Sequence, residues 1–441
     1  MIKDVQHRME LMRDRADGYK KLTSKEEAFQ VLFASETGTA ESLARDFSDA
    51  CTKSHSADSL NDMEPEDLDG KTNIFFVSTT GQGAMPQNGI EFFKLLCSRI
   101  EPFPLGTQYT IMGLGDSSYY HYLKAAKDID YQMQRLGAKC ISPMGLGDDS
   151  DEGGYEDGLQ LWVEAIWPAL GLNAPTEVPY ISPVDCNFSK RAILPEYEDN
   201  QIVGQYHNLI GLTSVTILKK KLLSEEGHNR DFYSFTLDSK ELAYEPGDTL
   251  EILPCNDYER VVSFLDEYTD DMDERTVIKL NHVFGISGEI SLGALFTNIL
   301  DIFGKPTKHF LQQLATFEDD IETRQNMLDV NTLKKMSSES GATFADVLLR
   351  FRSARIPLPA LLSMVPPIKV RGYSIASTPS VSPNNIELCV LIDTFWVDEG
   401  IRYGLTCDML RKLHIGENIC CRVKQGHMEP PFHHQPGKCL E

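Results

Sequence analysis

The chain has 441 residues, enough for two or three domains that each bury a core of their own. Its formal net charge of −24 disfavours nucleic acid and anionic membranes as partners, and leaves a basic protein as a possible one. The ten cysteines contain no C-x-x-C pair, which indicates reduced thiols and no metal site. No apolar run is long enough to span a bilayer, and the N-terminus lacks the pattern of a secretory leader or presequence, so we expect a cytoplasmic protein.

Residues 1–28 are charged and are expected to form an N-terminal extension. From residue 29 to residue 172, apolar runs alternate with helical periodicity, which predicts an α/β doubly wound parallel sheet. The expected strands are 29–35, 57–60, 74–79, 109–113 and 139–144, and the expected helices are 40–53, 89–100, 123–136 and 156–170. In such a sheet a ligand binds outside the carboxyl ends of the strands, where the strand order reverses.

The first loop at such a strand end is residues 35–40, with the sequence SETGTA. Hydroxyls and free backbone N–H groups at the start of a helix can hold a phosphate, and Gly38 lets the backbone approach it closely. An ordinary capped helix start is the alternative, because capping selects the same residues.

Two further loops leave the same edge of the predicted sheet. Residues 79–86 (TTGQGAMP) offer bare glycine backbone, and residues 114–122 (LGDSSYYHY) place three tyrosines just past a turn. A phosphate loop, glycine amides and an aromatic ring together suit a flat ring that bears a phosphate. Packing at the helix start is the alternative for two of the three tyrosines.

With residues 145–150 (GLGDDS), these loops resemble the four loops of a flavodoxin-type FMN domain. The resemblance implies that the FMN phosphate is held by Ser35, Glu36, Thr37, Gly38, Thr39 and Ala40, and that the isoalloxazine is bordered by Thr79, Thr80, Gly81 and Gln82. It also implies that the ring is covered by Leu114, Gly115, Asp116, Ser117, Ser118, Tyr119, Tyr120, His121, Tyr122 and Leu123. Tyr119 is then the stacking aromatic, and Asp149 closes the site.

The sequence departs from that family at two places. Residues 84–88 read AMPQN where relatives often have DPPDN, and Tyr122-Leu123 stands where they have Phe-Asn.

Between Lys139 and Lys190 there is no basic residue, whereas acidic residues crowd positions 148–157. A solvated helix entrance is the simpler interpretation, and a docking surface for a basic partner is the functional one. Residues 173–206 are rich in proline and poor in periodicity, which indicates a linker.

Residues 207–441 change character. Alternating strands at 212–218, 231–237, 249–253, 370–377 and 387–394, with a helical stretch at about 258–365, predict an antiparallel β-barrel with a helical insertion. Residues 371–374 (RGYS) supply an Arg fork for a diphosphate, an aromatic face and a hydroxyl on one side of a strand. Residues 404–407 (GLTC) open a short helix and form another anion site. A surface Arg with a packed Tyr is the alternative for the first motif.

Together with the Y-x-P-G-D turn at 244–248, these motifs resemble the FAD-binding barrel of the ferredoxin–NADP reductase family. The resemblance implies that Arg371 and Gly372 meet the FAD pyrophosphate and that Gly404, Leu405, Thr406 and Cys407 close over it. It also implies catalytic roles for Tyr373, stacked on the isoalloxazine, and for Ser374, near its N5. One departure is Gly341-Ala342, where relatives often carry a basic residue before the next helix.

FMN domain, linker and FAD barrel follow one another as in the diflavin reductases, and the loops are most similar to those of the NADPH-dependent diflavin oxidoreductase family. The resemblance implies electron flow from NADPH through FAD to FMN and on to an anamorsin-type iron–sulfur protein of cytosolic iron–sulfur assembly. A haem protein or methionine synthase is an alternative acceptor. No G-x-G-T-G loop follows the barrel, so we expect the NADPH domain to be absent. A non-catalytic, flavin-loaded protein that occupies the acceptor, or an FMN-only shuttle, is therefore a further alternative. We interpret His433-His434 and Cys439 as a frayed terminus.

Overall fold

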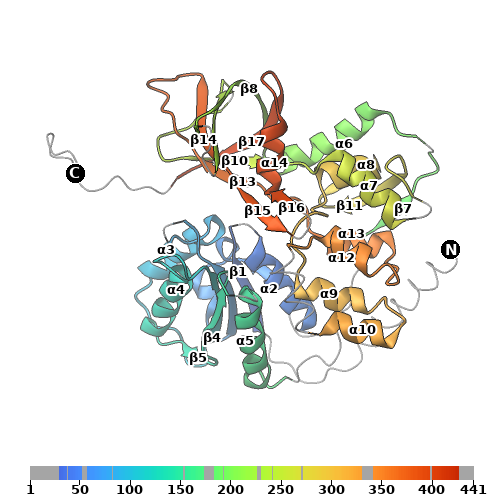
Figure 1. Ribbon diagram of the computed structural model, residues 1–441. Helices are drawn as coiled ribbons and strands as arrows, with labels where there is room; N and C mark the ends of the chain where they lie inside the picture. The colour runs from blue at the N-terminus through green and yellow to red at the C-terminus, as the bar shows by residue number, and fades with distance from the viewer. Residues whose placement is uncertain are drawn as a thin grey trace. The chain divides into compact units, whose positions relative to one another are not determined.

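The computed structural model describes residues 29–36, 38–51, 57–81, 83–151, 154–172, 183–191, 193–225, 230–240, 242–269, 272–329, 341–397 and 400–426. The chain forms two compact units (Figure 1). The first unit comprises residues 1–182, 307–339 and 353–357, and the second comprises residues 183–306, 340–352 and 358–441. The predicted extension at residues 1–28 lies outside the described residues.

The first unit is built on a parallel sheet. Its strands are β1 (Phe29–Ala34), β2 (Ala57–Ser59), β3 (Thr72–Ser78), β4 (Gln108–Gly115), β5 (Lys139–Cys140) and β6 (Gly145–Asp148). Its α-helices are α2 (Thr39–Ala50), α3 (Ile90–Ser98), α4 (Lys124–Arg135), α5 (Tyr155–Ala169), α9 (Lys308–Ala315) and α10 (Ile321–Leu328), and short 3-10 turns occur at η1 (Leu60–Asp62), η2 (Pro65–Leu68) and η3 (Gln87–Gly89). The strand order is β2-β1-β3-β4-β5, with β6 also paired to β4.

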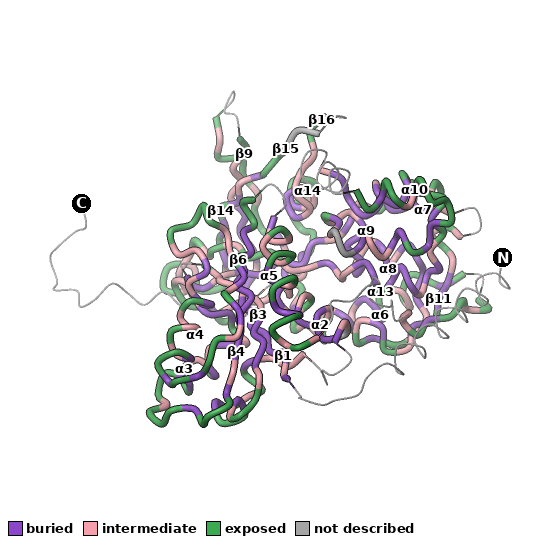
Figure 2. Tube along the Cα trace, turned by 90° about the horizontal axis from the view of Figure 1, so that it is seen from below, coloured by how far each residue is buried: buried purple, intermediate pink, exposed green. Residues whose placement is uncertain are grey.

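Both faces of this sheet are covered, as the apolar runs in its strands require. On one face, Phe75 and Val77 pack with Phe92 of α3 and Ile129 of α4. On the other face, side chains that include Phe76 and Met112 pack against α2 and α5, where Phe47 stacks on Trp167. Figure 2 shows β1, β3 and β4 buried between these layers. The predicted doubly wound fold is confirmed.

One predicted strand is wrong in detail. Residues 139–144 form no continuous strand: β5 ends at Cys140, and β6 begins only at Gly145. Pro143 lies between the two segments and has no N–H to give to a sheet ladder. The separation lets β6 continue along β4, where Asp148 pairs with Gly115 at the carboxyl edge.

The second unit contains an antiparallel barrel. Its strands are β8 (Thr213–Leu222), β9 (Asp231–Asp238), β10 (Thr249–Leu253), β13 (Arg371–Ser374), β14 (Asn385–Ile392) and β17 (Asn418–Lys424). They pair in the order β13-β10-β17-β8-β9-β14, and a bridge between Ile375 and Leu388 joins the two ends. A further hairpin, β15 (Thr394–Val397) with β16 (Gly400–Tyr403), leads into α14 (Leu405–Lys412). The predicted antiparallel barrel is confirmed.

The insertion between β10 and β13 is not wholly helical, in contrast to the prediction. It contains α7 (Tyr258–Tyr268), α8 (Leu292–Asn298), α12 (Phe344–Arg350) and α13 (Leu358–Met364), and also the hairpin β11 (Val277–Val283) with β12 (Ile286–Ser291). The turn of this hairpin uses positive φ angles at His282, Phe284 and Gly285. Two of these are not glycine, so the sequence carries no simple turn signal there.

Residues 183–209 also differ from the linker interpretation. β7 (Cys186–Phe188) pairs with β11, and α6 (Glu196–Leu209) places Asp199 against both the backbone N–H and the hydroxyl of Ser291. The prolines at 183 and 195 precede these elements, so a proline-rich segment here marks boundaries of ordered elements. The helices of the described residues are all too short or too polar to cross a bilayer.

Candidate functional site

The first predicted loop joins β1 to α2. Gly38 has a φ of 84° and is the residue before the helix, whose start receives no side-chain cap. The hydroxyl oxygen of Ser35 is buried and makes no hydrogen bond to a described residue. An uncapped helix start beside a buried, unsatisfied hydroxyl fits an anion such as a phosphate. Thr37 lies outside the described residues.

The second loop is a tight turn closed by backbone bonds. Thr80 and Ala84 exchange N–H···O contacts of 3.1 and 2.8 Å. Gly83 has a φ of 91°, and a Cβ there would lie 2.7 Å from Cβ of His121. The second and third loops are therefore in direct contact, at a distance that only glycine allows. Gln82 lies outside the described residues.

The third and fourth loops are tied together by carboxylates. Asp148 Oδ1 accepts the backbone N–H of Ser117 at 2.8 Å and that of Ser150 at 3.0 Å. Asp116 accepts hydrogen bonds from the hydroxyls of Ser118 and Ser150. Burial acts to raise the pKa of Asp148, but the hydrogen bonds from Ser117 and Ser150 outweigh burial and hold this pKa below its usual value.

Asp149 was the predicted closing residue, and it joins the third loop through its backbone N–H, which donates to Gly115 O at 2.8 Å. The side chains that tie the two loops are those of Asp116 and of the preceding Asp148, and sequence reasoning missed Asp148. The sequence alone does not distinguish the role of Asp148 from that of the adjacent Asp149, because the strand register that separates them is not yet known. The register places Asp148 opposite Gly115.

The three tyrosines of the third loop differ in exposure. Tyr119 and Tyr120 are 63% and 96% exposed, so their rings remain available to a ligand. Tyr122 is partly buried, lies 5.4 Å from Lys127 Nζ, and has its pKa raised to about 12 by burial and by nearby Asp148 and Asp151. Tyr119 as the stacking aromatic remains a prediction.

All four loops leave the carboxyl ends of β1, β3, β4 and β6. The strand order reverses between β1 and β3, because β2 lies on one side of β1 and β3 on the other. This is the place where a doubly wound sheet binds its ligand. The fold thus brings together four motifs that are far apart in the sequence.

In the second unit, the predicted RGYS motif forms β13. Tyr373 pairs with Leu250 and packs against the barrel core, whereas Ser374 is exposed. Adjacent residues of a strand point to opposite faces, so the Tyr373 ring and the Ser374 hydroxyl leave β13 in different directions. Their roles at the flavin remain predictions. Burial, with the nearby Cys407 thiol, raises the pKa of Tyr373 to about 12.

The neighbouring loop supplies a second anion-binding geometry. Gly404 precedes α14, whose start has no side-chain cap. Thr406 and Cys407 are buried, and the Thr406 hydroxyl lies near Tyr373 without a hydrogen bond of normal geometry to a described residue. Arg371 is exposed, and its Nη1 donates to the Lys369 carbonyl at 2.7 Å. These features fit a diphosphate next to a stacked ring.

Two further charged residues of this unit were missed from the sequence. Asp301 is 9% exposed, and one of its oxygens has no hydrogen-bond partner among the described residues. Burial raises its pKa despite nearby Arg371 and Lys369. Arg402 Nη1 donates to Gly341 O at 3.2 Å and to Asp346 Oδ2 at 2.9 Å. A cation from β16 therefore lies beside the Gly341-Ala342 segment, where the sequence has no basic residue.

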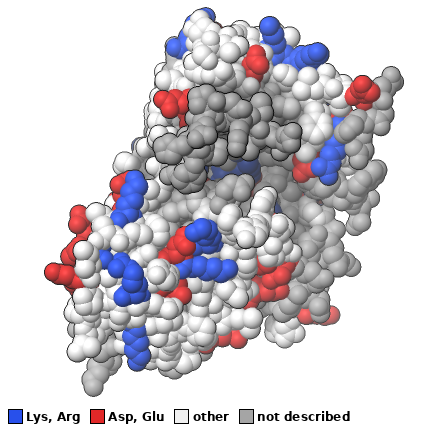
Figure 3. Space-filling model, turned by 90° about the vertical axis from the view of Figure 1, so that its left-hand side faces the viewer, with Lys and Arg blue, Asp and Glu red and all other residues white. Residues whose placement is uncertain are grey.

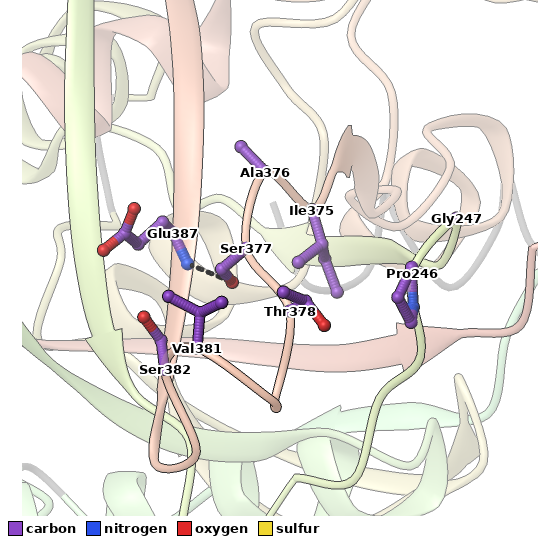
Figure 4. Close-up of a pocket in the computed structure, with 9 residues that line it drawn as sticks. All are labelled: Pro246, Gly247, Ile375, Ala376, Ser377, Thr378, Val381, Ser382 and Glu387. Atoms are coloured by element: carbon purple, nitrogen blue, oxygen red, sulfur yellow. Dashed lines mark hydrogen bonds between the residues drawn. The ribbon is translucent and has the colours of Figure 1, made fainter. Parts of the chain in front are cut away.

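A shallow pocket of about 400 Å³ lies between the Pro246-Gly247 turn and the segment that follows Ser374 (Figure 4). Ser377 holds this segment: its hydroxyl accepts the Glu387 backbone N–H at 3.0 Å and lies 2.8 Å from the Tyr244 hydroxyl. The predicted Y-x-P-G-D turn therefore braces the chain just after the RGYS strand.

Two family models match the chain in the same order as the two units. Residues 31–162 match flavodoxin, and residues 212–408 match the FAD binding domain family. The chain is 30% identical to NADPH-dependent diflavin oxidoreductase 1 of Candida albicans, over 90% of this chain and 72% of that protein. The chain belongs to the NADPH-dependent diflavin oxidoreductase family. Its cofactors are FMN and FAD, as predicted.

Other members of the wider group are similar as well. The chain is 31% identical to the mitochondrial pyruvate dehydrogenase [NADP(+)] of Euglena gracilis, over 92% of this chain and 22% of that protein. It is 26% identical to NADPH–cytochrome P450 reductase of Rattus norvegicus, over 88% of this chain and 62% of that protein. The chain thus spans less than a quarter of the length of the Euglena protein.

Proposed function

We propose that this diflavin oxidoreductase chain carries electrons between a nicotinamide and a one-electron protein acceptor. The observation that carries the proposal is the presence, in one chain, of two units whose anion loops and aromatic rings each suit a flavin. A flavin exchanges two electrons with NADPH and single electrons with a metal centre, so a pair of flavins can connect the two kinds of partner. In this proposal NADPH is the donor, FAD receives the hydride and FMN passes electrons onward.

In this proposal each unit binds one flavin with its own residues. Ser35, Gly38 and the start of α2 bind the FMN phosphate, and Tyr119 covers the flavin ring. Arg371 and the Gly404–Cys407 loop bind the FAD diphosphate, Tyr373 covers its ring, and the exposed Ser374 hydroxyl lies near N5.

For the acceptor we propose an iron–sulfur protein of cytosolic iron–sulfur assembly with a basic docking patch. The support is the acidic stretch at residues 148–157, which begins in the loop that borders the FMN site. Asp116 adds to it, with a pKa lowered by hydrogen bonds from Ser118 and Ser150. Basic and acidic side chains are interspersed on the face shown in Figure 3. The acidic stretch favours a steered encounter with a basic protein over binding to a polyanion.

A second candidate has the same cofactors but the opposite direction of electron flow. It is favoured by the 31% identity to a pyruvate dehydrogenase [NADP(+)] over 92% of the chain. In that case the reduced partner delivers single electrons at the FMN unit, and NADP⁺ is the final acceptor at the FAD unit.

One anaerobic experiment tests these proposals. The purified chain is analysed for FMN and FAD and then mixed with NADPH while flavin absorbance is followed. Equimolar flavins that bleach with NADPH, and reoxidise when a [2Fe–2S] protein is added, support the first proposal. Flavins that are reduced by the iron–sulfur protein, with NADPH appearing from NADP⁺, support the second. Two flavins that respond to dithionite and to neither partner support a non-catalytic carrier and overturn both.

A further inference from the structure

The phosphate loop of the first unit is held by the segment that precedes α3. The Ser35 backbone N–H donates to Asn88 Oδ1 at 2.8 Å, and the Gln87 backbone N–H donates to Glu36 Oε2 at 3.1 Å. Each segment therefore accepts, through one side chain, a backbone N–H of the other. We call the side chains of Asn88 and Glu36 the loop clamp.

The clamp has a rigid support of its own. Asn61 Nδ2 donates to the Gln87 carbonyl at 2.9 Å, and the Ser59 hydroxyl donates to the Asn88 carbonyl at 3.2 Å. Asn61 Oδ1 in turn accepts the first backbone N–H groups of α3, from Glu91 and Phe92. The position of the clamp is thus set by β2, η1 and α3.

Close packing adds to these hydrogen bonds. A Cβ at Gly89 would lie 2.9 Å from Cβ of Ala34, the last residue of β1. Segment 87–89 therefore lies directly against the strand end from which the phosphate loop begins. Side chains at position 89 are excluded, and the contact leaves little freedom for the loop to change its distance from the segment.

The clamp also explains what an acidic residue does in a loop expected to bind an anion. A carboxylate has no proton to donate to a phosphate and would repel it. Glu36 Oε2 instead accepts a hydrogen bond from the Gln87 N–H, and the backbone N–H of Glu36 lies 3.4 Å from the Ser78 hydroxyl. The Ser35 N–H is likewise bound, by Asn88. The Ser35 group that is left without a hydrogen bond to a described residue is therefore its buried hydroxyl.

We propose that Asn88 and Glu36 are positioning residues that set the shape of the phosphate loop and thereby the preference of the site for FMN over riboflavin. The inference deepens the proposed function at its FMN site. Neither side chain needs to touch the flavin ring. Loss of the clamp lets Ser35 and the start of α2 relax, which weakens phosphate binding and leaves ring binding as it is.

The test compares FMN with riboflavin, which lacks the phosphate. Dissociation constants for both are measured on the full chain after removal of bound FMN. For Asn88→Ala we expect the constant for FMN to rise about tenfold, the equivalent of about one hydrogen bond, and the constant for riboflavin to stay within about twofold. Gln160→Ala on the exposed side of α5 removes an amide from the same unit and is the matched control.

A second pair of variants separates the hydrogen bond from charge. Glu36→Gln and Glu36→Ala both remove the carboxylate, but only Gln keeps an acceptor oxygen for the Gln87 N–H. We expect the Ala variant to bind FMN about fivefold more weakly than the Gln variant, with equal affinity for riboflavin. Riboflavin affinity reports on the fold of the unit that carries the substitution, and FAD content reports on the fold of the other unit.

Each outcome bears on a definite claim. A parallel loss of FMN and riboflavin affinity in Asn88→Ala, or no loss of either, overturns the clamp. Equal FMN affinity of the two Glu36 variants overturns the role of Glu36. Failure of the unmodified chain to bind FMN at all would contradict the proposed function itself, independently of any variant.

Discussion

At the scale of single residues, Leu123 shows how a site loop can hold an unfavourable backbone. Its φ of 55° is in the left-handed region, where a side chain with a Cβ costs about 1–2 kcal/mol. It is also fully buried, and its side chain lies against Gly113 and Gly115 of β4. An asparagine would tolerate this conformation at lower cost. Here the burial of a leucine offsets the strain.

This strain predicts an unusual order of stabilities. Leu123→Gly and Leu123→Ala remove the same packing, but only glycine is relaxed at this φ. We expect the Gly variant to be more stable than the Ala variant by about 0.5–1 kcal/mol, after the entropy of glycine in the unfolded chain is subtracted. Urea unfolding of both variants measures the difference. An Ala variant as stable as the Gly variant would contradict the strain.

A second residue-scale prediction concerns Tyr373. Tyr373→Ala removes a ring that packs on the barrel core beside the Gly404–Cys407 loop, so we expect FAD affinity to fall about tenfold or more while FMN content stays unchanged. Tyr373→Phe keeps the ring and is expected to keep FAD. The FAD and FMN content of each variant, measured by chromatography after dialysis, tests this prediction. Full FAD retention in the Ala variant would argue against stacking on Tyr373.

At the scale of elements, α12 and β16 are joined by one carboxylate. Thr343 and Asp346 form a capping box at the start of α12, and Asp346 also accepts from Arg402 of β16. Although burial acts to raise it, these bonds lower the pKa of Asp346 from its usual 3.8. A carboxyl with a lowered folded pKa stabilises the protein above its unfolded pKa. That stability is lost as pH falls through the folded value.

The prediction is a change in acid sensitivity. Asp346→Asn removes the titrating group and is expected to lower the free energy of unfolding at neutral pH by about 1 kcal/mol, the usual worth of a helix cap. The deficit relative to the unmodified chain should shrink as pH falls below about 4, because the native Asp346 is then being protonated. Thermal midpoints across this range measure it. A deficit that is constant with pH would mean that the charge of Asp346 contributes nothing.

At the scale of the whole molecule, charge sets the expected encounter with an acceptor. A chain with a formal net charge of −24 attracts a basic protein at long range, and salt screens that attraction. The proposed acceptor surface at residues 148–157 is acidic as well.

We therefore expect electron transfer from the dithionite-reduced chain to cytochrome c, a basic protein, to slow several-fold between about 0.02 and 0.3 M salt. Transfer to the anionic ferricyanide should accelerate or stay constant over the same range, which makes it the control. Stopped-flow absorbance gives both rates. Equal slowing with the two acceptors would point to an effect of salt on the flavins and not on the encounter.

The sequence by itself determined the doubly wound sheet, the barrel strands and the site loops, but not α6, β7 or the β11–β12 hairpin. Apolar runs that alternate with helical periodicity can be satisfied only by a sheet covered on both faces, and short Ser/Thr/Gly loops mark where such strands end. This is why the fold class and the barrel could be predicted, whereas the two flavins followed from the resemblance of the loops to known families. The residue assignments within the sites remain predictions that the proposed substitutions test.

Only the tertiary structure decided which side chains meet. Strand register made Asp148, and not Asp149, a side-chain tie between two loops, and it put Tyr373 and Ser374 on opposite faces of β13. The partnerships of Ser35 with Asn88 and of Gly341 with Arg402 join positions 53 and 61 residues apart. Periodicity reports the local conformation of a segment, whereas such pairs depend on how strands align and how closely helices approach them, which no local pattern encodes.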